Sequence, residues 1–393
     1  MNIFETGKEV IKCIKSHGKE AYFVGGYVRD LYLNRTSQDI DITTSATPEE
    51  VISYFNNVKN TGKKYGSVTV LQGEFKFEVT TFRMDGTYLN NRKPEEVTFT
   101  KSLEEDLKRR DFTMNAIVMD ETEEVIDLFG GRQDIDNHII RSIGDPFKRF
   151  DEDALRMLRA FRFSSQLGFD IDQETLSALE AQKHLIQNIS IERVMVELSK
   201  LFEGPYKEKA IQYLVKTKFH EELYGLEQGL DFLQMVSKDY SPLEAFTVCF
   251  ILNDIDDVWK FSNREMKIIL RVITLHEVTK EGIWNKYILF SNGLDLCLLT
   301  NKVSVLLGYE DQAKDIEDIW NSLLVHDVCD LKFKGQDILE LTNLRKRSVI
   351  ALVIDDLLYN VIMEIMPNEY EVLKEFALQR VEELQQEMEE SDE

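Results

Sequence analysis

The segment from Ala21 to Thr44 limits most strongly what this chain can fold into. A short apolar strand is predicted before Gly25 and Gly26, and a helix is predicted to begin near Val28. Backbone N–H groups beside glycines can approach an anion closely, and the positive end of the helix dipole adds to the attraction. Arg29 lies in the first turn of this helix and would add a full positive charge. The segment therefore predicts a phosphate site where the strand ends.

Two carboxylates follow in the same segment, Asp39 and Asp41. In a strand their side chains project from one face, whereas Ile40 and Ile42 pack on the other. Their backbones would lie about 7 Å apart, which suits hard cations with oxygen ligands, and Mg²⁺ is the natural candidate. A glycine turn or an acidic pair alone is usually an ordinary turn or a solvated strand edge. Together they favour phosphoryl or nucleotidyl transfer from a nucleoside triphosphate.

A third carboxylate, Glu78, lies on a later predicted strand. Strands are predicted over residues 67–71 and 75–81, joined by a turn. Glu78 would either join the metal site or pair with Arg83, and both roles stay open. Residues 84–97 contain Gly, Pro and an Asn pair without periodicity, which is typical of a long functional or disordered loop.

A basic cluster with polar neighbours follows at residues 109–115. Arg109 and Arg110 precede Asp111, and Asn115 lies four residues further on. These residues suit a sugar and phosphate site, with an arginine for the triphosphate and an acceptor for a ribose hydroxyl. The alternative is a charged helix surface with internal ion pairs.

Beyond residue 145 the patterns are helical, with short breaks. The segment 151–169 is amphipathic, and Asp151 is predicted to cap a helix with Glu152 and Asp153 in its first turn. Arginines follow at intervals of three residues: Arg156, Arg159 and Arg162. On one continuous helix, Asp153 and Arg156 are about 60° apart and could face one planar group together. Arg162 would lie opposite Asp153 on such a helix.

An Asp and Arg pair can distinguish nucleobases. Cytosine and adenine each present an amino donor beside a ring nitrogen acceptor, whereas uracil and guanine present the reverse polarity. A carboxylate only accepts hydrogen bonds and a guanidinium only donates them. The pair formed by Asp153 and Arg156 therefore matches C and A and rejects U and G, because a mismatch leaves buried charges unpaired.

Composition sets the outer limits. A chain of 393 residues is long for a single core, so two or more domains are expected. It has no apolar run of eighteen residues, and residues 2–17 are predicted to form an amphipathic helix rather than a signal peptide, so a cytoplasmic protein without a membrane partner is expected. The four cysteines are widely scattered, which argues against a zinc site or a disulfide framework.

The net charge of −24 at first argues against a nucleic-acid partner. Residues 1–150 carry 21 Lys and Arg against 25 Asp and Glu, and the remaining residues carry 26 against 46, so most of the negative charge lies in the second part. Local basic patches persist there, and a patch can bind RNA on an acidic protein. The candidates near the end of the chain are Lys332, Lys334, Arg345, Lys346 and Arg347.

With these residues in place, the chain resembles the bacterial class II tRNA nucleotidyltransferases, the CCA-adding enzymes, and those of Gram-positive bacteria most. The resemblance covers about residues 20–205 as five ordered motifs: GGYVRD with RTSQDIDITT, RRDFTMNAI, DLFGGRQDI with IIR, EDALRMLRAFRF, and IERVMVELSKLF. It implies an α+β fold, with a nucleotidyltransferase head built on a mixed sheet (1–141). A helical neck for nucleotide recognition (142–205), a helical body (206–310) and a helical, tRNA-binding tail (311–393) would follow. The acidic end QQEMEESDE is expected to be solvated or disordered.

The same resemblance implies untemplated addition of C, C and A to the 3′ end of tRNA from CTP and ATP, with release of pyrophosphate. Asp39 and Asp41 would bind Mg²⁺ in a two-metal reaction, and homodimers are common in the family. The residues that would hold the incoming nucleotide are Gly26, Arg29, Arg110, Asp153, Arg156, Arg159 and Arg162. Secondary candidates are Gly25, Glu78, Asp111, Asn115 and Glu152.

Related activities share the same head motifs: CC addition, A addition and bacterial poly(A) polymerisation. The intact segment 84–97 argues against CC addition alone, because in this family that loop is associated with the change to ATP. A noncatalytic tRNA-binding protein is a further alternative, and the intact Asp39, Asp41 and Arg29 argue against it. Nucleotidylation of a small molecule would not require the long helical part.

Overall fold

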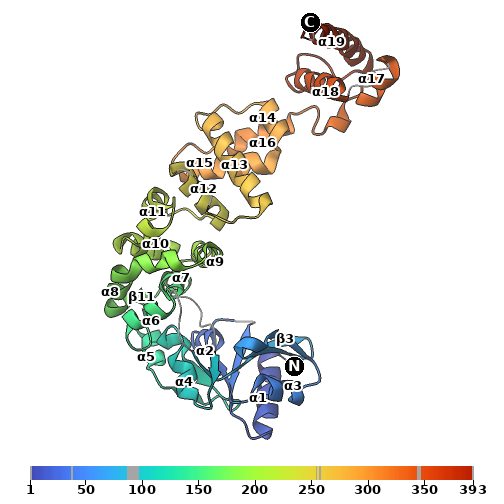
Figure 1. Cartoon of the computed structure of the whole chain (residues 1–393). Coiled ribbons are helices and arrows are strands. Elements are labelled where there is room, and N and C mark those ends of the chain that lie inside the picture. The colour runs from blue at the N-terminus through green and yellow to red at the C-terminus, as the bar shows by residue number, and fades with distance from the viewer. Residues whose placement is uncertain are drawn as a thin grey trace. The chain divides into compact units, whose positions relative to one another are not determined.

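The computed structural model describes residues 2–36, 39–85, 97–253, 255, 258–342 and 347–391 (Figure 1). It divides into two compact units, Met1–Lys260 and Phe261–Glu393. The predicted α+β class is confirmed, because a mixed sheet in the first unit is followed by helices. The four-part division predicted from the sequence is finer than these two units and stays a prediction.

A seven-stranded sheet forms the base of the first unit, with the strand order β3-β4-β5-β2-β1-β8-β9. The bounds of its strands are β1 Ala21–Val24, β2 Ile40–Thr44, β3 Val58–Gly62, β4 Ser67–Gln72, β5 Phe75–Thr81, β8 Ile117–Met119 and β9 Val125–Asp127. Strand β2 runs parallel to β5 and antiparallel to β1. The strands predicted around Asp41 and Glu78 are confirmed, although Asp39 lies one residue before β2. The edge strand β3 is too polar to be predicted.

Short strands β6 (Arg83–Asp85) and β7 (Val97–Phe99) pair in a separate two-stranded sheet. These strands include the first and last residues of the segment 84–97 that was predicted to be a loop. Residues 86–96 of that loop lie outside the described residues.

Helix α1 (Ile3–Ser16) covers one face of the sheet. Gly7 makes this close approach possible, because a Cβ at this position would lie 3.1 Å from Cε1 of Phe77. Ile40 is the cross-strand partner of Phe77, so it faces the same helix. Since successive side chains of a strand alternate, Asp41 faces the other side of the sheet, as the sequence predicts.

On the side of the sheet that carries Asp41, the strands pack against helices that follow β1 and β7 in the chain. Val24, the β1 partner of Asp41, packs with Leu107 in a buried cluster. The helices of this part of the chain are α2 Gly26–Tyr32, α3 Pro48–Tyr54, α4 Leu103–Lys108 and α5 Gly131–Asp136. Helix α2 begins two residues earlier than predicted, directly after Gly25.

The described residues that follow in the first unit form helices and the short strand β11 (Asp170–Ile171). The bounds of these helices are α6 Pro146–Glu152, α7 Leu155–Leu167, α8 Gln173–Gln182, α9 Ile191–Phe202, α10 Lys207–Lys216, α11 Glu227–Leu233 and α12 Pro242–Leu252. Strand β10 (Ile139–Ile140) pairs in parallel with β11 (Asp170–Ile171), which corrects the expectation of helices alone beyond residue 145. A two-residue strand has too little periodicity to be predicted.

The segment predicted as one helix from Asp151 is broken. Helix α6 begins earlier, because Asp145 caps it and Pro146 occupies its first position. It ends at Glu152, and Asp153 adopts an extended conformation with φ −139° and ψ 100°. Helix α7 then begins at Leu155, so Asp153 and Arg156 do not share one helix. The cap predicted at Asp151 and the 60° relation are therefore wrong.

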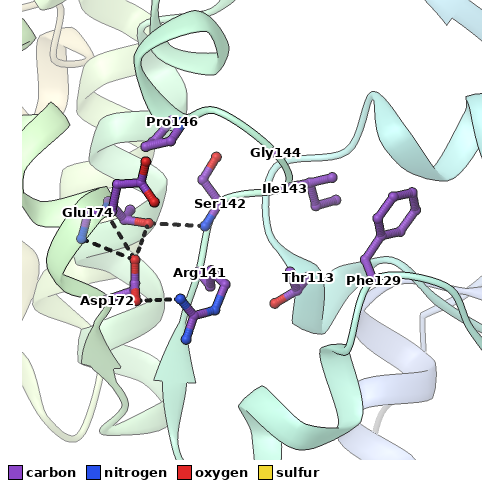
Figure 2. Close-up of a pocket in the computed structure, with 10 residues that line it drawn as sticks. Thr113, Phe129, Arg141, Ser142, Ile143, Gly144, Pro146, Asp172 and Glu174 are labelled. Atoms are coloured by element: carbon purple, nitrogen blue, oxygen red, sulfur yellow. Dashed lines mark hydrogen bonds and ion pairs between the residues drawn. The ribbon is translucent and has the colours of Figure 1, made fainter.

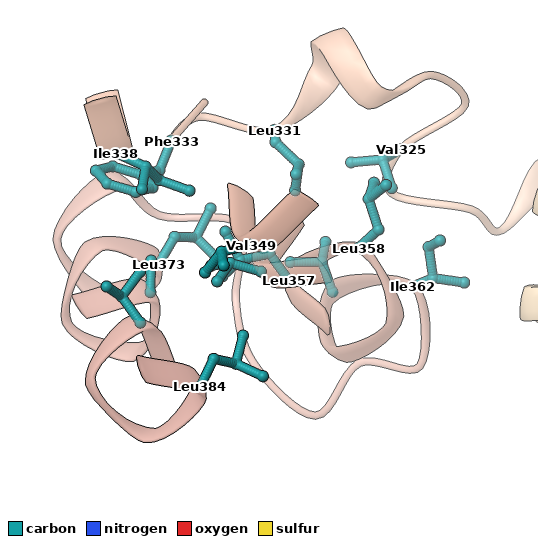
Figure 3. Close-up of a cluster of buried hydrophobic side chains, with 14 of the residues drawn as sticks. Val325, Leu331, Phe333, Ile338, Val349, Leu357, Leu358, Ile362, Leu373 and Leu384 are labelled. Carbon is teal, nitrogen blue, oxygen red and sulfur yellow. The ribbon is translucent and has the colours of Figure 1, made fainter. Parts of the chain in front are cut away.

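The second unit consists of helices around apolar clusters. Their bounds are α13 Asn263–Thr279, α14 Lys286–Asn292, α15 Leu294–Leu306, α16 Ala313–Asn321, α17 Gly335–Thr342, α18 Arg347–Ile362 and α19 Tyr370–Ser391. Figure 3 shows a buried cluster in which side chains from α17, α18 and α19 meet Leu331 and Phe333.

The acidic end of the chain, expected to be solvated or disordered, is helical as far as Ser391, where the described residues end. Its residues are mostly Glu, Gln, Leu and Met, which favour helices, and no Gly or Pro interrupts them. Leu373, Ala377, Val381 and Leu384 are buried at intervals of three or four residues, so one side of the helix is anchored in the core of the unit.

Candidate active site

One cleft of the first unit, with a volume of about 1010 Å³, brings the predicted site residues together. Both predicted metal ligands and all seven predicted nucleotide-binding residues line it: Asp39, Asp41, Gly26, Arg29, Arg110, Asp153, Arg156, Arg159 and Arg162. Gly25, Asp111 and Asn115 line it as well. Of the secondary candidates, Glu78 and Glu152 are not among the described residues that line the cleft.

The glycine turn lies at the start of α2. Gly25 has φ +76°, a conformation that residues with a Cβ rarely adopt, so glycine is required there. A Cβ at Gly25 would lie 3.4 Å from Nη1 of Arg110, and one at Gly26 would lie 3.6 Å from Nη2 of Arg29. Two guanidinium groups therefore lie close to the turn, which suits a polyanionic ligand.

Asp39 lies directly before β2, and Asp41 is the second residue of that strand. Asp41 is in register with Glu78 of β5. Desolvation and the negative charges of Glu78 and Asp39 raise the pKa of Asp41 to about 6, against the opposing effect of Arg110. Such crowding of carboxylates favours a bound cation.

The donor set of this acidic pair fits Mg²⁺, which commonly uses one or two carboxylates together with substrate phosphates. In the described part of the chain, no group of three His, Cys, Asp or Glu side chains is arranged to hold a metal. Glu78 lies beside Asp41, and Arg83 donates to the backbone carbonyl of Tyr65. Neither role predicted for Glu78 is settled by these contacts.

A buried hydrogen-bond network joins α2, residues 111–115 and α7. Asp111 accepts from Nε and Nη2 of Arg159 at 2.7 and 2.5 Å, and from Nδ2 of Asn115 at 3.0 Å. Asn115 in turn accepts from Nη1 of Arg29 at 2.7 Å. Burial raises the pKa of Asp111, but Arg159 and the hydrogen bonds to the carboxylate lower it well below its usual range. Asp111 thus anchors Arg159, and its predicted role as a ribose acceptor stays a prediction.

Three arginines surround the ring of Phe163. The guanidinium carbons of Arg162, Arg29 and Arg159 lie 4.3, 5.2 and 5.3 Å from the ring centroid. Desolvation, and then the charge of Arg159, lower the pKa of Arg162 to about 10, although Glu197 pairs with it at 2.9 Å. Nε of Arg162 has no acceptor among the described residues. This concentration of positive charge favours an anion such as a triphosphate.

Arg156 and Asp153 are each held by other groups. Arg156 donates to the carbonyls of Arg149 and Arg109, both at 2.9 Å, and to Glu152 at 2.8 Å. Glu152 therefore holds Arg156 without being among the described residues that line the cleft. Asp153 contacts Arg193 of α9 at 3.2 Å. The break between α6 and α7 allows Asp153 and Arg162 to line the same cleft, which a continuous helix would not.

Three residues that support the predicted site residues were not predicted from the sequence: Phe163 and Glu197, which contact Arg162, and Arg193, which contacts Asp153. The apolar spacing in IERVMVELSKLF predicts a helix that buries Val194, Leu198 and Leu201, and α9 confirms this, but the spacing does not identify a role for its charged face. Arg193 and Glu197 lie four residues apart on that face. This spacing was the available signal, although it does not identify their partners on α7.

A second, smaller hollow of about 160 Å³ lies between the end of the head motifs and α8 (Figure 2). Arg141 pairs there with Asp172, and the backbone N–H of Ser142 donates to Thr175. None of the predicted site residues lines it, so we assign it to packing.

The predicted RNA-binding residues lie in the second unit. Lys332 and Lys334 are exposed and alternate with the buried Leu331 and Phe333. Arg345 and Lys346 lie outside the described residues, and Arg347 is the first residue of α18. Their contact with RNA stays a prediction. Across the described residues, the helices are too short or too polar to cross a membrane.

Comparison with known protein families gives three matches in chain order. The poly(A) polymerase head domain matches residues 21–141, the RNA and SrmB-binding site of polymerase A matches residues 168–226, and tRNA nucleotidyltransferase domain 2 matches residues 252–377. The first match contains the glycine turn, both aspartates and the Arg110 segment.

Individual relatives match almost the whole chain. The CCA-adding enzyme of Bacillus cytotoxicus is 37% identical over 388 residues, which cover 95% of this chain and 98% of the relative. That of Listeria monocytogenes is 40% identical over 350 residues, covering 86% and 89%. The crystal structure of the Bacillus stearothermophilus CCA-adding enzyme in complex with CTP has a TM-score of 0.83 at 33% identity, covering 99% of this chain and all of that one. The chain therefore belongs to the family of CCA-adding enzymes, the tRNA nucleotidyltransferases.

Proposed function

We propose that the cleft adds C, C and A to the 3′ end of tRNA, using CTP and ATP and releasing pyrophosphate. The observation that carries this proposal is the convergence in one cleft of an acidic pair, a cluster of arginines and an Asp and Arg pair. The relative from Bacillus stearothermophilus, solved with CTP, supports the choice of nucleotide.

We propose that the arginines hold the triphosphate. Arg29, Arg159 and Arg162 are fixed around Phe163, and Arg110 lies beside the glycine turn. Because their orientation is set before a ligand arrives, little reorganisation would be needed to bind it. The α-phosphorus would then be held toward the acidic pair.

The family implies a divalent metal, and we propose Mg²⁺ held by Asp39 and Asp41. When bound, one or two such ions would lower the pKa of the terminal 3′-hydroxyl of the tRNA and neutralise charge on the phosphates. The two aspartates supply the oxygen ligands on the open face of β2, and Arg110 limits their mutual repulsion.

We propose that Asp153 and Arg156 select the base. The carboxylate accepts from the amino group of cytosine or adenine, and the guanidinium donates to the adjacent ring nitrogen. Uracil and guanine would place a carbonyl against the carboxylate and an N–H against the guanidinium, which is unfavourable. The backbone carbonyls that hold Arg156 keep its plane fixed, so this edge can replace a template strand.

The test is primer extension. The protein is incubated with Mg²⁺ and tRNA that lacks CCA, together with CTP, ATP, or both, and the products are resolved at single-nucleotide resolution. Full CCA addition with both nucleotides is expected. Products that end after two cytidines, addition of A alone to tRNA that already ends in CC, or a long A tail would instead indicate the CC-adding, A-adding or poly(A)-polymerising alternatives.

Two further proposals concern the setting of the reaction. We propose a cytoplasmic location, where tRNA and nucleoside triphosphates are both available, and fractionation with immunodetection tests it. A homodimer is a prediction from the resemblance, and analytical ultracentrifugation tests it.

A further inference from the structure

Asp153 lies at a point where the backbone leaves helical geometry, directly after the last residue of α6. Among the described residues, two groups donate hydrogen bonds to its carboxylate. The backbone N–H of Leu155 donates to Oδ1 at 3.2 Å, and Nη2 of Arg193 lies 3.2 Å from Oδ2 and 3.5 Å from Oδ1. The side chains of Asp153 and Arg193 are 16% and 27% exposed, so this ion pair is largely shielded from solvent.

Arg193 reaches Asp153 from a rigid element. It lies in the first turn of α9, where its backbone N–H donates to Ser190 at 3.0 Å. The neighbouring Val194 and Leu198 are buried in the packing of α9 against α7. The guanidinium is therefore presented by a packed helix rather than by a loop, which suits a group that has to hold another in place.

We infer that Arg193 is a positioning residue for base selection: it fixes the carboxylate of Asp153 so that an oxygen remains directed at the incoming base. This inference rests on the proposed function of the cleft. A carboxylate offers about four acceptor sites, and Leu155 and Arg193 occupy only some of them. One remains for the amino group of cytosine or adenine. Arg193 itself would not contact the base.

The two base-reading groups are oriented by different parts of the chain. Arg156 is oriented by backbone carbonyls of residues 109 and 149, whereas Asp153 depends on a side chain from residue 193. Removal of Arg193 should therefore affect only the acceptor half of the base-reading edge. Without it, the carboxylate can turn away, and the penalty against a base with a carbonyl at that position decreases.

The experiment compares Arg193→Gln and Arg193→Lys with the unmodified protein. The ratio of kcat/KM for CTP to that for UTP is measured on tRNA that lacks CCA. We expect Arg193→Gln to lower this ratio about tenfold, the scale of one charged hydrogen bond, mainly through a higher KM for CTP. Arg193→Lys should restore part of the ratio, because an ammonium keeps the charge but not the forked geometry.

Arg264→Gln is the matched control, since Arg264 lies exposed in the first turn of α13 and outside the cleft. Its CTP to UTP ratio should equal that of the unmodified protein. Asp153→Asn alone and combined with Arg193→Gln completes a double-mutant cycle. If Arg193 acts through Asp153, adding Arg193→Gln to Asp153→Asn should change the ratio little further.

The outcomes separate the two hypotheses. If the unmodified protein does not add C from CTP, the proposed function itself fails. If it adds C but Arg193→Gln lowers kcat/KM equally for CTP and UTP, Arg193 only holds the helices together and the inference is overturned. If Arg193→Gln does not fold, as judged by circular dichroism, Arg193→Lys decides: a ratio about threefold lower supports the inference, and an unchanged ratio overturns it.

Discussion

Replacement of Asp111 by asparagine tests the network that joins the head to α7. The side chain keeps its shape but loses its charge and one of its two acceptor oxygens. It can no longer accept both hydrogen bonds from Arg159 while also accepting from Asn115 and from the backbone N–H of Phe112. Arg159 is then left without its main anchor, and Asn115 loses the partner that orients it toward Arg29.

The magnitude follows from burial. Removing one partner of a buried ion pair costs about 3–5 kcal/mol. Asp111 is only 9% exposed, but the side chain of Arg159 is 32% exposed, so water can solvate its guanidinium and reduce the free-energy cost. We therefore expect the free energy of unfolding to decrease by about 2–3 kcal/mol. For a unit of this size, the Tm should fall by about 4–12 °C.

The assay pairs thermal unfolding with nucleotide kinetics. Because Arg159 belongs to the proposed triphosphate site, Asp111→Asn should also raise the KM for CTP and for ATP about tenfold, the effect of misplacing one charged donor. Asp134→Asn is the control: Asp134 is 6% exposed and accepts from Thr113 and Arg141, but it does not line the cleft. That variant should lose stability without any change in KM. Equal changes in KM for both variants, or no change for Asp111→Asn, would refute the assignment of Asp111 as the anchor of Arg159.

Three further predictions concern the same cleft. Asp39→Asn combined with Asp41→Asn should lower the rate of CCA addition at least about 100-fold, the scale on which electrostatic stabilisation acts, with an unchanged far-ultraviolet spectrum; near-normal activity would exclude them as metal ligands. Phe163→Leu should raise the KM for both nucleotides at least about tenfold, because cation–π contacts with three arginines contribute about 0.5–1 kcal/mol each; an unchanged KM would show that the ring only fills space. The pKa of Asp111 is lower in the folded protein than in the unfolded chain, where it is near 4, so its charge stabilises the fold above that pH and this stabilisation is lost as pH falls. In urea unfolding between pH 3 and 7, the free energy of unfolding should therefore depend less on pH for Asp111→Asn than for the unmodified protein.

The parts of the site that depend on local signals could be predicted from the sequence. A turn that requires positive φ restricts its residue to glycine, so Gly25 is visible in the sequence as the end of a strand. The alternation of a strand places Asp39 and Asp41 on one face whatever packs above them. In contrast, the register that brings Glu78 beside Asp41 was not predictable, because it depends on how two strands distant in the chain pair.

The break between α6 and α7 shows why the arginine-rich segment is harder to predict. Periodicity continues across residues 151–167, so one helix is the natural interpretation. The structure instead follows the stronger start signal of Asp145 and Pro146, and the helix that begins there ends before Asp153. Competing start signals only a few residues apart cannot be ranked from helical spacing alone.

The two ends of the proposed nucleotide site are built differently, so substitutions at each end should affect nucleotide binding differently. The phosphate end contains a local turn, because Gly25, Gly26 and Arg29 are neighbours in the chain, although Arg159 joins it through a distant contact with Asp111. The base-reading end depends on contacts that span about 40 residues or more: Asp153 with Arg193, and Arg156 with the carbonyl of Arg109. Substitutions near the glycine turn should therefore change affinity for all nucleoside triphosphates alike. Substitutions on the cleft-facing side of α9 should change the choice among them, although no residue there needs to contact the base.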